Sequence, residues 1–168
     1  MRFRRMPVVA LSIILVLALT QAVSVNIRAQ GNNPFVGTWK LISIETRGAD
    51  GALIPGPNPV GGVNPTGTVM YDAAGHVSLQ IMPSGRPPSL NILQPLSPEQ
   101  AKEALFGYIA YYGTYTLDQR TRTMHIHFDG SLNPSMVGTN GERYYEFNGN
   151  RMKFRAGANT TLSWERVR

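Results

Sequence analysis

The sequence predicts an all-β fold, an eight-stranded antiparallel up-and-down barrel with one short helix. Three observations predict it. Short segments of β-branched and aromatic residues recur through the 168 residues, with turn-forming residues between them. Only one segment carries the signals of a helix start. The strands are short and regularly spaced, which is typical of a sandwich or a barrel, and closure into a barrel leaves no unpaired strand edge.

Residues 1–30 are expected to be a signal peptide followed by a short linker. Three arginines form a basic head, an uncharged run follows over residues 8–19, and small residues then offer a cleavage point. The run is shorter than the about 20 apolar residues that a spanning helix needs, so we expect no stable membrane span after cleavage. An uncleaved anchor is the alternative. The mature chain, residues 31–168, then suits one secreted or periplasmic domain.

The first half of this domain is predicted to contain one strand, a hairpin and two loops. The first strand is expected over Trp39–Arg47 and ends at a Gly-Ala-Asp-Gly turn. A hairpin follows over residues 68–82, because apolar and polar residues alternate with a period of two beside a turn at Asp72–Gly75. The loops, residues 54–67 and 83–98, are rich in proline, and we expect no regular strand in the first of them.

The one predicted helix runs from Pro98 to about Phe106. Ser97 is a suitable N-cap, Pro98 suits the first turn, and Gln100 stands three residues after the cap, as in a capping box. Five strands follow the helix, and an Asn-Gly pair between two of them predicts a hairpin turn. These strands are expected over Tyr108–Leu117, Thr121–Asp129, Arg143–Phe147, Arg151–Arg155 and Thr160–Val167.

The composition excludes several classes of function. There is no cysteine, which excludes a disulfide, a thiol nucleophile and a zinc–thiolate site. The formal net charge of +6 comes largely from four arginines in the first 30 residues, and the remaining basic residues nearly balance the 10 acidic ones. Nucleic-acid binding needs a concentrated basic patch, so we expect no nucleic-acid partner. No phosphate-binding or dinucleotide-binding motif is present, and we expect no cofactor. The sequence indicates no particular oligomeric state.

The stretch MHIHFD holds the residues best suited to chemistry. Alternate residues of a strand share a face, so His125, His127 and Asp129 are expected on one side and apolar residues on the other. Two histidines and a carboxylate can bind a metal. Three side chains in line on one strand rarely converge on a single metal ion, however. We therefore expect this face of the strand to be a polar outer face without a metal site. In the alternative, with the faces reversed, His127 points inward and acts with Arg143 and Tyr145 in acid–base catalysis.

The two ends of the domain resemble those of lipocalins. The stretch GTWKL is similar to the start of their first strand, with its G-x-W motif, and TLSWERVR resembles their closing strand. The stretches GHVSLQIMPSGRP, GYIAYYGTYTLD, GSLNPSMVGT and RYYEF extend the resemblance to the bacterial and fungal lipocalin-like domain family, over most of residues 35–168. The resemblance implies that Trp39 closes one end of the barrel. It also implies that Arg166 lies across the indole in a cation–π contact, worth about 0.5–2 kcal/mol. The alternative is that Trp39 is only a core aromatic.

These features favour a non-enzymatic protein that binds a small, largely apolar molecule in the barrel. Such sites are concave and mostly apolar, with few polar groups. One alternative is a cavity enzyme, of the isomerase or cyclase type, that acts on a hydrophobic metabolite. Another is a domain for protein contact with no small ligand, in which the inward side chains simply fill the core. The expected lining residues are Tyr71, Leu79, Ile81, Ile126, Phe128, Tyr145, Phe147, Met152 and Phe154.

Overall fold

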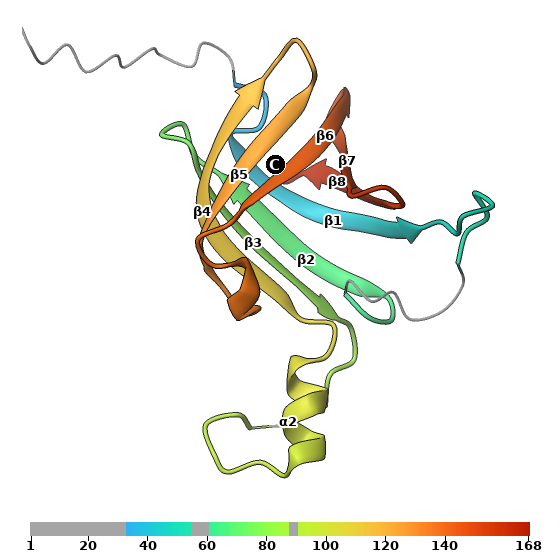
Figure 1. The fold of residues 1–168 in the computed structure, drawn as a ribbon, viewed down its shortest axis with the longest axis vertical. Coiled ribbons are helices and arrows are strands. Elements are labelled where there is room, and N and C mark those ends of the chain that lie inside the picture. The colour runs from blue at the N-terminus through green and yellow to red at the C-terminus, as the bar shows by residue number, and fades with distance from the viewer. Residues whose placement is uncertain (1–32, 55–60, 88–90) are drawn as a thin grey trace, which may run out of the picture. The chain divides into compact units, whose positions relative to one another are not determined.

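A computed structural model describes residues 33–54, 61–87 and 91–168 of the chain. Within them, eight strands form a closed antiparallel barrel in which each strand pairs with its neighbours in sequence and the last pairs with the first (Figure 1). The predicted fold class, an eight-stranded up-and-down barrel with a short helix, is confirmed. The elements are β1 (Gly37–Thr46), β2 (Pro65–Tyr71), β3 (His76–Pro83), α2 (Pro98–Leu105), β4 (Ile109–Asp118), β5 (Thr123–Ser131), the 3₁₀ helix η1 (Pro134–Met136), β6 (Asn140–Asn148), β7 (Arg151–Ala156) and β8 (Thr160–Arg166).

The signal peptide and linker expected in residues 1–30 lie outside the described residues, as does the start of the domain that follows them. In the part of the chain that is described, no helix has the length and apolar character needed to cross a membrane.

The period-two patterns place apolar side chains inside the barrel. On β3, Val77, Leu79 and Ile81 are almost fully buried, while the residues between them face outward. On β5, Ile126 and Phe128 are buried in the same way. Successive side chains of a strand point to opposite faces, so an alternating sequence forms a sheet with one buried face and one solvent-exposed face.

Two strands begin three residues earlier than their sequences indicate. β2 starts at Pro65, inside the loop for which no strand was predicted, and Pro65 pairs with Pro83 at the end of β3. Proline is tolerated as the first residue of a strand, because the amide hydrogen it lacks is not needed there. β6 starts at Asn140 rather than Arg143, and Gly141 pairs with Ile126. Gly141 has no side chain to contribute to an alternating pattern, so the sequence does not mark this start.

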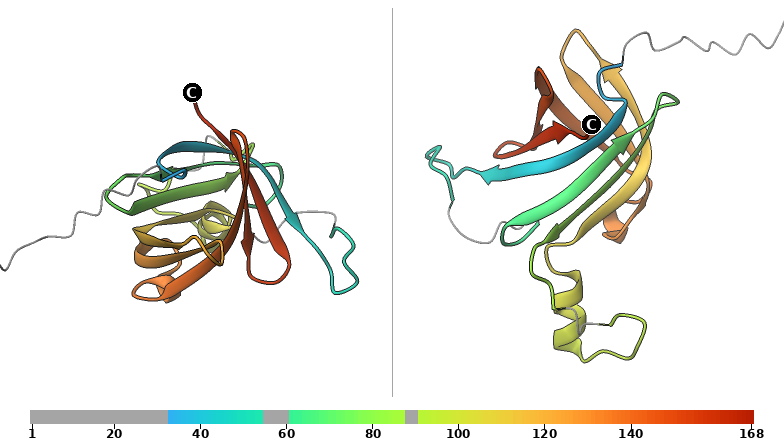
Figure 2. Two further views of the ribbon diagram at one scale, coloured as in Figure 1. Left: turned by 90° about the horizontal axis from the view of Figure 1, so that it is seen from above. Right: turned by 180° about the vertical axis from the view of Figure 1, so that it is seen from behind.

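The helix α2 forms as its cap predicts. The Ser97 hydroxyl accepts from the Gln100 amide at 3.2 Å, and the Gln100 side chain accepts from the Ser97 amide at 2.9 Å, which completes the capping box. At the other end, Arg86 donates to the Ala104 carbonyl oxygen at 2.6 Å and lies over the Tyr108 ring. Arg86 therefore stabilises the C-terminus of this helix. Figures 1 and 2 place α2 beyond the end of the barrel at which β3 ends and β4 begins.

At the opposite end of the barrel, Trp39 and Arg166 lie together. They are register partners on β1 and β8, and the guanidinium carbon lies 4.2 Å from the centroid of the Trp39 ring. Arg166 also donates to the backbone carbonyls of Val36, at 2.7 Å, and of Pro34. Glycine is needed at position 37 for two reasons. A Cβ at this position would lie 2.9 Å from an Arg166 nitrogen, and the φ of Gly37, +127°, is one that residues with a side chain rarely adopt.

Candidate functional site

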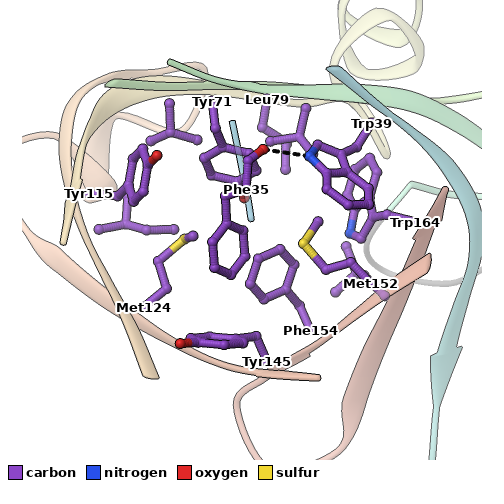
Figure 3. Close-up of a cluster of buried hydrophobic side chains, with 14 of the residues drawn as sticks. Phe35, Trp39, Tyr71, Leu79, Tyr115, Met124, Tyr145, Met152, Phe154 and Trp164 are labelled. Carbon is purple, nitrogen blue, oxygen red and sulfur yellow. Dashed lines mark hydrogen bonds between the residues drawn. The ribbon is translucent and has the colours of Figure 1, made fainter. Parts of the chain in front are cut away.

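Phe35, which precedes β1, fills the Trp39 end of the barrel interior. Its side chain is fully buried among five aromatic rings, with centroid separations from 4.8 to 6.4 Å (Figure 3). The Phe35 carbonyl accepts from Trp39 Nε1 at 2.7 Å, and the Phe35 amide donates to Asn33 Oδ1 at 3.0 Å. These bonds hold the segment before β1 in place. Aromatic side chains therefore occupy this half of the interior.

The other half of the interior holds a cavity of about 240 Å³. It lies beside the fully packed aromatic end and is lined from every strand except β1, and from η1. Its walls consist mainly of isoleucine, leucine and aromatic side chains. An engineered cavity of about 150 Å³ with similar walls binds benzene, so this one has room for a larger molecule, of about ten non-hydrogen atoms.

Five of the nine side chains predicted to line a cavity do line it. They come from β2, β3, β5 and β7, and alternation placed each of them on the inner face. Their contact with a ligand stays a prediction. The five are Tyr71, Leu79, Ile81, Ile126 and Phe154.

The other four, Phe128, Tyr145, Phe147 and Met152, also point inward but do not line the cavity. Tyr145 and Phe147 pack against Phe35, with ring centroids 4.9 and 4.8 Å away. Met152 is fully buried in the same aromatic cluster (Figure 3). Phe128 lies edge-on to Tyr111, at 4.9 Å between ring centroids. Strand alternation separates inside from outside, but it does not show which inward side chains meet each other.

Sequence reasoning missed seven lining residues. Leu162 and Trp164 had a usable signal, because they share one parity on the predicted last strand. Met136 had none, since η1 follows a strand and has no alternation of its own. The seven are Ile109, Tyr111, Met136, Ala156, Thr160, Leu162 and Trp164.

One guanidinium group lines this mainly apolar cavity. Arg143 on β6 is half-buried, and its Nη1 donates to the Glu142 carbonyl oxygen at 2.8 Å. Burial raises the pKa of the Tyr111 hydroxyl, and the nearby Arg143 charge acts in the opposite direction. Burial likewise raises the pKa of Tyr71, where Tyr111 adds to the rise and Arg143 opposes it. Both hydroxyls therefore stay protonated at neutral pH and can donate hydrogen bonds.

The indole nitrogen of Trp164 also stands out. The Trp164 side chain lines the cavity and is 1% exposed, and its Nε1 has no hydrogen-bond partner. It is the only such buried side-chain nitrogen or oxygen among the described residues. A buried donor without an acceptor is destabilising by about 1–3 kcal/mol, so each instance in a folded protein needs a physical reason.

The histidines of β5 lie on the outer wall, so the reversed assignment of faces is wrong. The side chains of His127 and Asp129 are each 46% exposed, and His127 Nδ1 lies 2.8 Å from Asn140 Oδ1. His125 forms an ion pair with Glu142 across the neighbouring strand, at 3.3 Å. Nowhere in the described ranges do three histidine, aspartate or glutamate side chains group closely enough to hold a metal ion.

The alternative catalytic set does not assemble in the structure. Arg143 lines the cavity, Tyr145 packs against Phe35 at the aromatic end, and His127 faces solvent. No side chain among the described lining residues is a histidine or a carboxylate. The cavity thus offers hydrogen-bond donors and one fixed positive charge. Tyr71 and Tyr111 stay protonated near neutral pH, so neither can serve as a general base there.

Several solved structures resemble this chain at low sequence identity. A lipocalin-like protein from Bacteroides uniformis is 13% identical, with 79% of this chain and 98% of that chain covered and a TM-score of 0.44. A protein from Bacteroides eggerthii is 14% identical, with 79% and 99% covered and a TM-score of 0.43. A mutant of the fluorescent protein UnaG is 15% identical, with 80% and 96% covered and a TM-score of 0.36.

Family membership comes from the sequence as a whole. No curated protein matches the chain. The profile of the lipocalin-like domain family matches residues 36–167, which span the barrel from the residue before β1 to the residue after β8. The motifs GTWKL and TLSWERVR, from which the resemblance was inferred, lie at the two ends of this match. The chain belongs to the lipocalin-like domain family.

Proposed function

We propose that this protein binds one small, largely apolar molecule in the cavity between the aromatic end of the barrel and η1. The observation that supports the proposal is the cavity itself, about 240 Å³ with mainly aliphatic and aromatic walls. A molecule that enters it leaves water for an apolar surface, which yields roughly 25 cal/mol for each Å² of apolar area that is buried. The protein has already placed these side chains, so little further ordering is needed on binding.

The proposal is tested by titration calorimetry with 1-octanol, a neutral molecule of the size that the cavity holds. The variant Ala156→Phe adds a phenyl group to the lining and should abolish binding. Its control is Ala110→Phe on β4, where Ala110 pairs with Gln80 on the outer face, and this variant should bind as the natural protein does.

A natural ligand is sought by mass spectrometry of the protein purified without detergent from its host. The proposal predicts a co-purified apolar compound or, failing that, binding of 1-octanol that Ala156→Phe removes. Absence of any co-purified compound, together with no heat of binding and no thermal shift across a series of alcohols and fatty acids, would contradict the proposal.

We also propose that the protein acts outside the cytoplasm. The support is the sequence of residues 1–30, with its basic head and uncharged run. The intact mass of the protein from its host should correspond to a chain that starts near residue 25 or 31. Recovery of the full-length chain from the cytoplasmic fraction would contradict this.

A further inference from the structure

The cavity carries more polar character than an apolar ligand requires. Arg143 brings a full positive charge to its wall, and no acidic side chain among the described residues forms an ion pair with it. The nearest acid in sequence, Glu142, faces the other side of the sheet and pairs with His125. Of the five N–H donors of the guanidinium, one Nη1 hydrogen is directed to the Glu142 carbonyl. The Tyr111 hydroxyl also forms a side-chain hydrogen bond with this guanidinium. The remaining donors are available to a ligand.

Neutral donors accompany this charge. Tyr71 and Tyr111 are buried, they line the same cavity, and both hydroxyls sense the Arg143 charge. Trp164 adds the indole N–H that has no acceptor. A cavity that served only hydrocarbons would gain nothing from these groups, because the donors without a protein acceptor lose water without a replacement when an apolar molecule enters.

We propose that the ligand is an amphipathic organic acid whose carboxylate is held by Arg143 and Tyr111, and whose apolar body fills the rest of the cavity. This inference rests on the proposed function. A carboxylate accepts two parallel hydrogen bonds from a guanidinium, and such charge-assisted bonds are about twice as strong as neutral ones. The Trp164 N–H then donates to an oxygen of the same ligand, which satisfies the buried donor.

The cavity volume limits the size of this acid. Room for about ten non-hydrogen atoms corresponds to a monocarboxylic acid of about eight carbons. A longer acid would have to leave part of its chain outside the cavity. Octanoate is therefore the probe, and 1-octanol is its neutral counterpart with the same chain.

The two probes separate anchoring from simple partitioning. Partitioning into an apolar cavity favours the alcohol, because an ionised carboxylate is much more strongly hydrated. We expect the natural protein to bind octanoate at least about 10-fold more tightly than 1-octanol at pH 7.5, the ratio that one charge-assisted hydrogen bond supplies. In Arg143→Met this preference should disappear or reverse, while a circular dichroism spectrum that matches that of the natural protein shows that the variant is folded.

Three further variants identify the contribution of each group. Arg155→Met removes one positive charge from the outer face of β7 and should leave octanoate binding unchanged, which separates a specific contact from the overall charge. Arg143→Lys keeps the charge without the paired donors and should retain only part of the preference. Trp164→Phe removes the unpartnered N–H and should lower the affinity for octanoate about 2- to 10-fold.

Each outcome bears on one proposal or on both. Equal or tighter binding of 1-octanol by the natural protein, or an unchanged octanoate affinity in Arg143→Met, would overturn the carboxylate anchor and leave the apolar binding function standing. An equal loss in Arg155→Met would also overturn the anchor, since the effect would then be one of net charge. Failure of both probes to bind would overturn the inference and the proposed function together.

Discussion

Replacing Phe35 with alanine tests whether this side chain fills the aromatic end of the barrel. The ring is fully buried and contacts five other rings, so the substitution removes apolar contact on every side. The hydrogen bond from Trp39 Nε1 goes to the backbone carbonyl of residue 35, so it can survive the change. Phe-to-Ala changes in protein cores reduce the free energy of unfolding by about 3–5 kcal/mol, and we expect a loss in this range. In a domain of this size, that corresponds to a fall in Tm of about 10–20 °C.

Urea titration followed by circular dichroism measures this loss, and Phe106→Ala is the matched control. Phe106 ends α2 and is 57% exposed, so its removal should change the free energy of unfolding by about 0.5 kcal/mol or less. If Phe35→Ala is largely unfolded, Phe35→Leu keeps most of the buried volume and should show a smaller, measurable loss. A loss for Phe35→Ala no greater than that of the control would show that Phe35 is not a structural part of the barrel interior.

Three further predictions concern the two ends of the barrel. Arg166→Met should lower the free energy of unfolding by about 1–3 kcal/mol in urea titration, because it removes the contact with Trp39 and leaves backbone carbonyls without their donors; a change under about 0.3 kcal/mol would contradict this. Ser97→Ala should weaken α2 by about 1 kcal/mol, seen as faster amide hydrogen exchange in the helix while exchange in the barrel stays unchanged; equal acceleration in both would argue against a local effect. The pKa of Asp72 is lowered, first by the His76 backbone N–H and then by its side chain. This carboxyl therefore contributes stability above its unfolded pKa that is lost as pH falls through the folded one, so Asp72→Asn should show a smaller loss of stability below about pH 4. An identical acid denaturation profile would count against that assignment.

Local signals in the sequence were sufficient to predict several of the elements. The alternation around Val77 and Leu79 predicted β3, and the Asn-Gly pair predicted the turn between β6 and β7. The cap at Ser97 predicted α2 to within one residue. Each of these signals involves residues a few positions apart, and their geometry follows from the backbone. The resemblance in GTWKL and TLSWERVR also indicated the contact of Trp39 with Arg166, which the structure places within cation–π distance.

The positions of the packed half and of the cavity could not be predicted before the fold was known. Phe35 lies outside every strand, and no pattern marked it, yet its ring is fully buried in the aromatic cluster that occupies one half of the interior. Tyr145 packs against Phe35 in the aromatic half, and Tyr111, Trp164 and Arg143 line the cavity. Alternation shows only that a side chain points inward. Which inward side chains meet depends on the stagger of eight strands around the barrel and on the volume of side chains far away in the sequence, and neither is encoded in a short stretch of residues.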